Sequence, residues 1–416
     1  MRTLHLLRKY DTAEWGGTES AVQRLLDGLT EQGVESVLYA PKPSNLPQAA
    51  VTKTTCHPVK RFNACVPVWG LTPEEKRQFV SVGGNLFSFD LLPALWREHE
   101  IELIHTHTLG RLGGIAAAVA RQRHLPFVVT IHGGYLDLPK PLQESFSRPS
   151  DRGFDWGRFF GLVFQSRQML HQADALLTCN PTEAALLRKQ FPKTRVQVQP
   201  HGISVARYEA DCRETALAAW PQLQKRHVLL CVGRIDPVKN QSWLVDQAQR
   251  LFKRHPDSIL VFAGPSTDER YSEALDRSIE KWGIGQRIIF TGGLPPEDPR
   301  LIGLFQLASA VLLPSISETF GLVLLEAWAA GTTVISSRTS GAQALIEHSK
   351  DGWLFDLDKP ETFHHAVDVA IENPDMRSRF AAAGHDKVRR EYDMPVIALR
   401  AKQLYHQLIE AKACTT

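Results

Sequence analysis

Cysteine is sparse in this chain of 416 residues, with six in total. None of them forms a Cys-x-x-Cys pair or a Cys/His spacing typical of a zinc site. The sequence therefore predicts neither a disulfide framework nor a structural zinc, and we expect a reduced protein of the cytoplasm.

Long apolar runs are also missing. No window offers the roughly 18 uncharged apolar residues of a membrane span. The apolar stretch within residues 1–9 is too short for the core of a signal peptide and is typical of a first strand. Any membrane contact would then be peripheral, between the N-terminal domain and the inner face of the membrane.

Net charge is low, at +3, and there is no lysine-rich run or basic stripe interleaved with aromatic residues. Nucleic acid is therefore not expected as a partner. Residues 1–205 carry 23 Lys and Arg against 18 Asp and Glu. This excess either favours an anionic acceptor or a membrane surface, or is the ordinary scatter of charge on solvated faces.

Length and composition are those of a globular protein with two domains. A chain of 416 residues exceeds what one hydrophobic core usually supports, and 43% hydrophobic residues are enough for two cores. In the first half, β-rich runs alternate with helical patterns, which predicts a parallel sheet with helices on both faces. The strands are expected at 3–7, 34–39, 101–105, 127–131, 175–178 and 196–199.

The alternation stops after residue 205 and restarts beyond a linker at 206–226. The second set of strands is expected at 227–232, 258–263, 287–290, 310–313 and 333–336. We therefore predict an α/β protein with two doubly wound, Rossmann-like domains at 1–205 and 206–385, followed by a helical stretch at 386–416. In such sheets ligands lie beyond the carboxyl ends of the strands, so the ligand is expected in a cleft between the domains. A long surface loop at 139–157 should precede a helix at 158–173.

The most informative segment, residues 317–327, directly follows the strand expected at 310–313. Glu318 falls in the strand-to-helix loop, and a helix should begin at about Gly321. The free N–H groups and the positive dipole end of a helix suit a diphosphate, and glycine lets a phosphate approach the backbone. The candidate residues of this diphosphate site are therefore Phe320, Gly321 and Leu322.

Glu326 lies inside the otherwise apolar run 322–330, where a buried carboxylate needs a partner. Helical side chains lean toward the N-terminus of their helix, so this carboxylate leans toward the same ligand and could accept hydrogen bonds from ribose hydroxyls. The alternative is a salt bridge to a neighbouring helix. The position of Glu326 eight residues after Glu318 favours the ligand.

Two cations, Arg234 and Lys239, follow the strand expected at 227–232 and precede a helix. A departing nucleotide diphosphate develops negative charge, and fixed cations stabilise that charge without reorganisation. The alternative is that both are ordinary surface cations. Their place at the carboxyl end of a strand favours a functional role.

Two further candidates lie in the first half. Gly16 and Gly17 open the first helix, which either allows a phosphate to pass close by or is a plain tight turn. They are not part of a Gly-x-Gly-x-x-Gly fingerprint, so a nicotinamide dinucleotide is not supported. His132 follows the strand 127–131 and could bond a sugar hydroxyl or stabilise the transition state, or it could be structural.

Two patterns that suggest metals are interpreted as structural. His105 and His107 alternate after a strand, but no third ligand with plausible spacing accompanies them, so we expect strand-end residues. The triplet Asp356-Leu357-Asp358 matches an Asp-x-Asp metal signature, yet it falls late in the chain before Lys359-Pro360. A solvated turn is expected there, and no metal is predicted.

Taken together, these residues resemble the family 4 glycosyltransferases of the GT-B fold, over essentially the whole chain. The resemblance is most specific in the second half, where the motifs follow the order of the family, including its Glu-x7-Glu pair. They are Gly233-Arg234, Lys239-Asn240, Phe290-Thr291-Gly292, Pro314-Ser315, Glu318 with Phe320-Gly321, Glu326-Ala327 and Gly331.

The resemblance implies a role for each residue of the second half. Arg234 and Lys239 would bind the donor diphosphate, Glu326 the ribose, and Glu318 the transferred sugar near its 3-hydroxyl. Gly292 would belong to the same donor site.

For the first half, the resemblance implies that Gly16 and Gly17 pass close to the phosphate and the sugar, and that His132 contacts the sugar. The last helical stretch would cross back onto the first domain. The implied reaction is hexose transfer with retention by a front-face route, usually with no metal or cofactor. The donor phosphate would accept the proton of the acceptor.

One segment departs from the family pattern: His201-Gly202-Ile203 stands where Asn-Gly-Val followed by Asp is frequent. The nucleotide, UDP or GDP, stays open. So does the acceptor, which is a glycan, a lipid-linked molecule or a small molecule in polysaccharide or glycoconjugate synthesis. The alternative function is a nucleotide-sugar hydrolase or epimerase of the same architecture.

Overall fold

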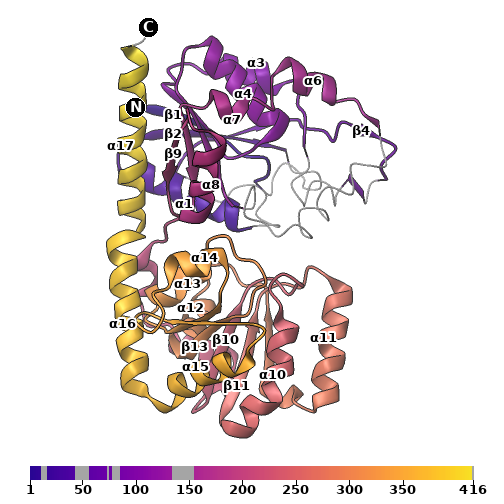
Figure 1. Cartoon of the computed structure of the whole chain (residues 1–416), viewed down its shortest axis with the longest axis vertical. Coiled ribbons are helices and arrows are strands. Elements are labelled where there is room, and N and C mark those ends of the chain that lie inside the picture. Colours follow the sequence, from indigo (N-terminus) through magenta and orange to yellow (C-terminus); the bar gives the residue numbers. More distant parts are fainter. Residues whose placement is uncertain (11–15, 43–55, 73–74, 77–84, 134–153, 415–416) are drawn as a thin grey trace. The chain divides into compact units, whose positions relative to one another are not determined.

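In a computed structural model, the chain divides into two compact units. The structure describes residues 1–10, 16–42, 56–72, 75–76, 85–133 and 154–414. The first unit is Met1–Gly202 together with Met394–Thr416, and the second is Ile203–Asp393 (Figure 1). The divisions fall after Gly202 and Asp393, where the sequence suggested 205 and 385. We describe each unit by itself.

The first unit is built on a parallel sheet of seven strands, in the order β3-β2-β1-β5-β6-β8-β9. The central strands are buried along their whole length, and two of the three are mostly apolar, whereas β5, the middle strand of the sheet, ends in a buried histidine and threonine. β3 was not predicted, and the other strands lie within two residues of the predicted bounds. The strands are β1 (Arg2–Leu6), β2 (Glu35–Pro41), β3 (Val59–Phe62), β5 (Leu103–Thr106), β6 (Phe127–Ile131), β8 (Ala175–Thr178) and β9 (Arg195–Val198).

Helices connect these strands, and one predicted helix is wrong. In place of a single helix at 158–173 there are two short ones, because Gln165 adopts a positive φ of 49° and ends the first. A two-stranded antiparallel sheet, β4 (Val68–Trp69) with β7 (Phe154–Asp155), also belongs to this unit. The helices are α1 (Gly17–Glu31), α3 (Leu91–Trp96), α4 (Gly110–Gln122), α6 (Arg158–Val163), α7 (Met169–Gln172) and α8 (Pro181–Gln190).

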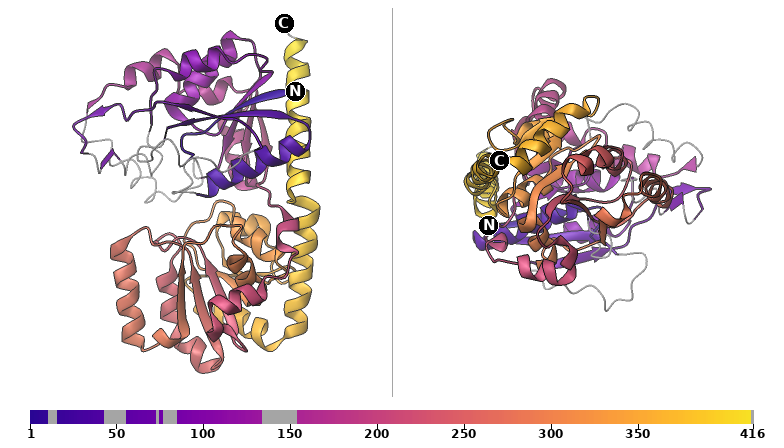
Figure 2. Two further views of the ribbon diagram at one scale, coloured as in Figure 1. Left: turned by 180° about the vertical axis from the view of Figure 1, so that it is seen from behind. Right: turned by 90° about the horizontal axis from the view of Figure 1, so that it is seen from below.

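The last helix, α17 (Met394–Ala413), packs against α1 in the first unit (Figure 2). Gly28 of α1 makes the close approach possible, because a Cβ there would lie 2.7 Å from Cγ of Met394. Lys402 of α17 donates a hydrogen bond to the carbonyl of Gln32 at 2.6 Å. The C-terminal segment therefore completes the core of the domain in which the chain began.

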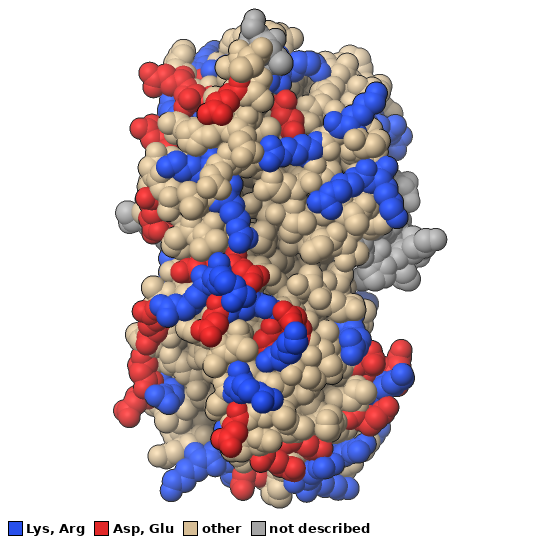
Figure 3. All heavy atoms as spheres, turned by 60° about the vertical axis from the view of Figure 1, so that its left-hand side comes forward, with Lys and Arg blue, Asp and Glu red and all other residues tan. Residues whose placement is uncertain are grey.

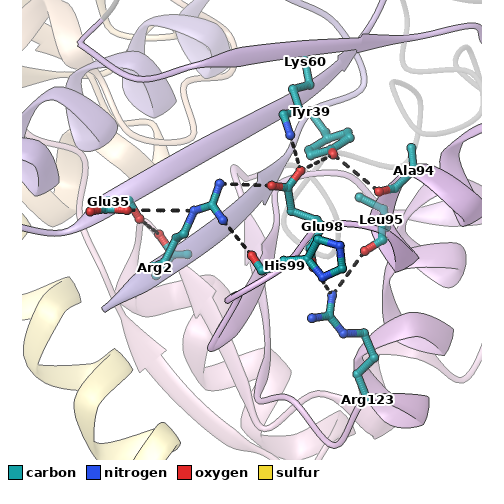
Figure 4. Close-up of polar contacts among 10 residues, drawn as sticks. Arg2, Glu35, Tyr39, Lys60, Ala94, Leu95, Glu98, His99 and Arg123 are labelled. Carbon is teal, nitrogen blue, oxygen red and sulfur yellow. Dashed lines mark hydrogen bonds and ion pairs between the residues drawn. The ribbon is translucent and has the colours of Figure 1, made fainter.

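A buried carboxylate ties three strands of this sheet to α3 (Figure 4). Glu98, only 5% exposed, accepts hydrogen bonds from Lys60 and from the Tyr39 hydroxyl, both at 2.5 Å. Its second oxygen accepts one from Arg2 at 3.1 Å. Burial opposes ionisation, but these donors prevail and lower the pKa of Glu98.

The second unit has a parallel sheet of six strands in the order β12-β11-β10-β13-β14-β15. Its strands are β10 (His227–Val232), β11 (Ser258–Ala263), β12 (Ile288–Gly292), β13 (Ala308–Leu313), β14 (Val334–Ser337) and β15 (Trp353–Phe355). Its α-helices are α9 (Arg213–Ala219), α10 (Gln241–Arg254), α11 (Glu269–Trp282), α12 (Pro299–Leu307), α13 (Leu322–Ala329), α14 (Ser340–Leu345), α15 (Pro360–Glu372) and α16 (Pro374–Glu391). The expected linker 206–226 contains α9 and two short 3-10 helices.

Two surface properties bear on partners. On the face drawn in Figure 3, basic and acidic side chains are mixed in the lower part, whereas the basic side chains at the upper right are separated by uncharged residues. None of the helices in the described part of the chain combines the length and the apolar character needed to cross a bilayer.

Candidate functional site

The strongest candidate site lies where two neighbouring strands of the second unit end. β10 and β13 are adjacent and parallel, so the loops that follow them leave the sheet side by side. The amide of Ile316 donates a hydrogen bond to the carbonyl of Val238 at 2.9 Å. The side-chain amide of Asn240 donates to the carbonyl of Pro314 at 3.1 Å. These bonds join the two predicted motifs into one structure.

An ion pair links the same two loops through their side chains. Nζ of Lys239 lies 2.6 Å from Oε2 of Glu318. Their side chains are 20% and 17% exposed, so the pair is largely, but not fully, shielded from solvent. The structure thus brings together two predicted site residues that are 79 positions apart in the sequence.

Arg234 lies in the same loop as Lys239 and is the more accessible cation, with 60% of its side chain exposed. It pairs with Asp236 at 3.0 Å, and the same carboxylate accepts a hydrogen bond from the amide of Lys239 at 2.9 Å. Asp236 was not predicted. The available signal was its position three residues before Lys239, which is typical of an aspartate that caps a turn.

The helix after β13 begins as predicted, with Gly321 immediately before α13. Gly321 has a φ of 99°, which strongly favours glycine, and a Cβ there would lie 2.9 Å from Cδ1 of Leu324. Gly321 has no side chain to cap the helix, and within the first turn the amide of Leu324 donates to the carbonyl of Gly321 at 2.9 Å, which leaves the amides of Leu322 and Val323 as candidate donors to an anion. Leu322 is the first residue of the helix and is half-buried.

Gly341, which was not predicted, packs directly against the backbone of the Glu318 loop. Its amide donates to the carbonyl of Glu318 at 2.8 Å. A Cβ on Gly341 would lie 2.6 Å from the amide nitrogen of Phe320, too close for any other residue. This close approach is visible only in three dimensions, because Gly341 belongs to the next βα connection. Phe320 itself is buried.

Glu326 occupies the second turn of α13 and is only 7% exposed. Its neighbours in the helix, Leu324, Leu325 and Trp328, are fully buried. The Glu326 side chain is therefore largely shielded from solvent.

Gly292 lies apart from the Lys239–Glu318 pair, at the end of β12. It lines a cavity of about 270 Å³ at the carboxyl ends of β10, β11 and β12. Ile235, next to Arg234, lines the same cavity. The other lining residues are Gly264, Ser266, Ser272, Leu275, Asp276 and Phe290. The Arg234 loop therefore has the ion pair on one side and this cavity on the other.

In the first unit, Gly16 caps α1 and Gly17 is its first residue. The amide of Gly16 donates to Oε2 of Glu19 at 3.1 Å, and Glu19 is buried. A Cβ on Gly17 would meet no atom of the described residues within 4 Å, so packing against this part of the chain does not explain the second glycine. The preceding residues, 11–15, lie outside the described part of the chain, as does most of the predicted loop 139–157.

His132 directly follows β6 and belongs to a row of histidines. Its Nε2 lies 3.0 Å from Nδ1 of His107, and its ring stacks on that of His201 with centroids 5.2 Å apart. Burial, together with the nearby His201 and the charge of Arg8, holds the pKa of His132 well below its ordinary value. A neutral imidazole is therefore present at this position.

His105 lies in β5 and His107 directly after it, but the expectation that no third ligand accompanies them is wrong. β1 lies beside β5, and it brings His5 next to both, with ligand-type nitrogens of the three within 4.8 Å of one another. Both nitrogens of His105 are already hydrogen-bonded, to the Tyr405 hydroxyl at 2.7 Å and the Thr130 hydroxyl at 2.6 Å. Hydrogen bonding thus accounts for this cluster.

The Asp-x-Asp triplet lies in a turn between β15 and α15. Asp356 pairs with Arg338 at 3.2 Å, and both side chains are about two-fifths exposed, at 41% and 42%. Asp358 is exposed. The two carboxylates therefore occupy a solvated turn, and Leu357 between them accepts a hydrogen bond from the indole of Trp243 in α10 at 3.1 Å.

Comparison with known proteins identifies the family. Residues 15–207 match the model described as "Glycosyltransferase Family 4", and residues 213–387 match "Glycosyl transferases group 1". The chain is similar to the D-inositol 3-phosphate glycosyltransferase of Corynebacterium glutamicum, at 26% identity over 97% of this chain and 94% of the relative. A protein with the same description from Corynebacterium urealyticum is 30% identical over 58% of each chain.

Solved structures share the fold. Anabaena Alr3699/HepE in complex with UDP and glucose has a TM-score of 0.72 at 17% identity, covering 97% of this chain and 99% of that one. Sucrose-phosphate synthase from Thermosynechococcus elongatus has a TM-score of 0.74 at 22% identity, covering 99% of each chain. With two family models that together match most of its length and a fold shared with these enzymes, the chain belongs to the family 4 glycosyltransferases of the GT-B fold.

Proposed function

We propose that this protein is a retaining hexosyltransferase that uses a nucleotide diphosphate sugar, UDP- or GDP-linked, as its donor. The observation that carries the proposal is the Lys239–Glu318 ion pair between the loops after β10 and β13, with the exposed Arg234 beside it. The HepE complex, whose fold the chain shares, contains UDP and glucose.

The diphosphate is proposed to bind between the cations and the start of α13. Arg234 is exposed enough to turn from Asp236 toward a phosphate, and Lys239 would exchange part of its contact with Glu318 for the same phosphate. The N–H groups at the start of α13, at the positive end of the helix dipole, would add hydrogen-bond donors to the phosphate. Buried Glu326 would accept hydrogen bonds from the ribose hydroxyls, and the cavity beside Gly292 would hold the base.

In the proposed reaction, the bond from the anomeric carbon to the donor phosphate breaks. A bond from the acceptor oxygen to that carbon forms on the same face, with retention. The proton of the acceptor hydroxyl passes to the departing phosphate oxygen. Arg234 and Lys239 stabilise the charge on the leaving diphosphate, so the chemistry needs no metal or cofactor. Glu318 would position the transferred sugar.

The acceptor is proposed to carry a phosphate. Arg8 lies close enough to His132, and Arg24 close enough to His201, for each guanidinium to lower the pKa of its histidine. Burial is the larger cause of both shifts, but two guanidinium groups lie near these histidines, and a guanidinium is a good partner for a phosphate. The curated relatives are named for D-inositol 3-phosphate, and a lipid-linked phosphate has the same chemistry. Either acceptor would place the enzyme in glycoconjugate or polysaccharide synthesis.

A peripheral membrane contact is proposed for an exposed aromatic surface on the first unit, at the end that carries β4 and α6 (Figures 1 and 2). The Trp69 and Phe154 rings stack with centroids 5.7 Å apart. Arg158 on α6 is exposed, whereas Asp155 is paired with Arg111. Aromatic residues with cations suit the interface of an anionic bilayer. The surface comprises Trp69, Phe89, Phe154, Phe159, Leu162 and Val163, each at least 54% exposed.

Vesicle flotation tests this contact. We expect binding to vesicles that contain anionic lipid and not to neutral vesicles. The double variant Phe159→Ser/Leu162→Ser should lose binding, while Leu399→Ser, at a residue 43% exposed on α17, should retain it. Equal binding by both variants would remove the aromatic surface from the proposal.

The function is tested by donor binding and product analysis. A donor that binds the native state raises the melting temperature, so one of UDP-, GDP- or ADP-hexose should produce a shift. That donor is then incubated with inositol phosphate or with a lipid-linked acceptor, and the anomeric configuration of the product is determined by NMR. Retained configuration supports the proposal. Free hexose as the sole product would favour a hydrolase, and conversion of the donor to its epimer would favour an epimerase.

A further inference from the structure

Three histidines from adjacent strands form a hydrogen-bonded row across the first sheet. Nδ1 of His5, in β1, lies 3.1 Å from Nε2 of His107, just after β5. Nδ1 of His107 lies 3.0 Å from Nε2 of His132, just after β6. His5 is fully buried and His107 is 6% exposed. Each ring thus uses one nitrogen for its neighbour toward the carboxyl edge.

The far end of this histidine row is anchored in the core. Nε2 of His5 lies 3.1 Å from the hydroxyl of Thr3, which in turn lies 3.1 Å from the hydroxyl of Ser36. Both hydroxyl residues are buried. The row therefore ends on buried hydroxyl groups, which can donate or accept a hydrogen bond.

The near end of the row is the ring of His132. Nδ1 of His132 is buried and has no hydrogen-bond partner among the described residues. The same holds for Oε1 of Gln199, a residue 6% exposed whose Nε2 donates to the carbonyl of Ile397 at 3.0 Å. Both residues line one cavity of about 20 Å³, room for a single hydroxyl-sized group. Leaving such atoms unsatisfied costs about 1–3 kcal/mol each, so a hydroxyl group, of a water molecule or of a ligand, is favoured there.

The rings of the row are coupled because they are neutral. Burial lowers the pKa of His5 to about 3 and holds those of His107 and His132 well below their ordinary values. A neutral imidazole has one donor and one acceptor nitrogen. Once one ring donates to the next, the tautomers of all three are set, and reversing one requires reversing the others.

We propose that His5 and His107 are positioning residues that fix the tautomer and the ring orientation of His132, so that its Nδ1 and Oε1 of Gln199 bind one hydroxyl group of the substrate. This inference rests on the proposed function for the identity of that hydroxyl, as one on the transferred sugar or the acceptor. The row itself stands on the distances given above. No covalent step is assigned to it.

His105 provides a matched control. It lies next to the row, with its ring centroid 4.1 Å from that of His107, but its nitrogens bond Tyr405 and Thr130 instead of the row. Tyr405 is fully buried on α17. Tyr405→Phe therefore removes a buried hydroxyl–imidazole hydrogen bond that lies outside the row. Thr3→Val removes such a bond at the end of the row, with little change in the shape of the side chain.

The test combines NMR of protein with ¹⁵N-labelled histidine and steady-state kinetics. In the wild type, His132 should be neutral with one tautomer from pH 5 to 8. His5→Phe should mix the tautomers of His107 and His132 and lower kcat roughly 10-fold, with little change in the KM of the donor. Tyr405→Phe should change neither.

The NMR readout separates this inference from the proposed function, because it needs no donor or acceptor. An unchanged His132 tautomer in His5→Phe would overturn the inference even if transfer is observed. Altered tautomers with unaltered kcat would also overturn it, by showing that the row is only structural. If His5→Phe does not fold, Thr3→Val is measured instead, with the same two outcomes deciding.

Discussion

Lys239 and Glu318 lie 2.6 Å apart, Nζ to Oε2, across the two loops that follow β10 and β13. Each is therefore held in place by the other before any ligand arrives. A diphosphate that binds Lys239 must compete with Glu318 for it, and it frees part of the carboxylate to contact a sugar hydroxyl. The first three predictions concern this site.

Lys239→Ala should lower kcat at least about 100-fold, because it removes a cation that stabilises the leaving diphosphate and also leaves Glu318 without this partner. Initial rates at saturating donor measure the effect. Lys350→Ala is the control, since Lys350 pairs with Glu347 at 2.7 Å but its side chain is 75% exposed. Loss of activity in Lys350→Ala as well would show that the effect comes from the loss of positive charge in general and not from this site.

Glu326→Ala should abolish transfer and weaken binding of the free nucleotide diphosphate, measured by calorimetry. The physical reason is loss of the proposed acceptor for the ribose hydroxyls at a position largely shielded from solvent. Glu280→Ala, at an exposed position on α11, is the control. Unchanged nucleotide affinity in Glu326→Ala would show that this carboxylate is structural, a salt-bridge partner within the fold.

Gly321→Ala should reduce both stability and donor binding. A positive φ costs a non-glycine residue about 1 kcal/mol, and the added Cβ would also crowd Leu324. Gly283→Ala is a matched control, because Gly283 has a φ of 63° and a Cβ there would meet no atom within 4 Å. It should lose similar stability in urea titrations and keep full donor affinity.

Glu98→Gln should destabilise the first unit by roughly 1–3 kcal/mol at pH 7, since it weakens hydrogen bonds from Lys60, Tyr39 and Arg2. The pKa of Glu98 is lowered below its ordinary 4.5 by folding. Its stabilisation is therefore present above that value and lost as pH falls through the lowered pKa. Urea titrations at pH 7 and pH 3 should show a smaller difference from wild type at pH 3.

The buried histidines predict a second pH effect, in a higher range. The pKa values of His5, His57 and His201 are lowered by burial to about 3, 4 and 4. The unfolded chain protonates these groups near 6.5 and the folded chain only at lower pH, so stability is full above 6.5 and falls below it. Each group contributes a slope of about 1.4 kcal/mol per pH unit. A flat stability profile from pH 7 to 5 would contradict the burial of these rings as neutral groups.

Much of the fold followed from local pattern. Strands such as Phe127–Ile131 and His227–Val232 were predicted with their observed bounds, because a buried parallel strand is a short, almost uninterrupted apolar run between polar loops. The start of α13 at Gly321 followed from the glycine and the apolar run after it. Where local signals were weak, as at β3 or at the break near Gln165, the prediction failed.

Arg234, Lys239 and Glu318 were identifiable by sequence because each lies in a loop that follows a strand, and parallel strands end at a common edge. What the sequence alone determined was therefore this set of loops, together with Glu326 in the helix that follows one of them. Which of these side chains touch was decided by strand order. The pairing of Lys239 with Glu318, and of His5 with His107, depends on β10 lying beside β13 and β1 beside β5. Such contacts join residues 79 and 102 positions apart, and no local pattern encodes them, because the order of strands is set by the packing of the whole domain.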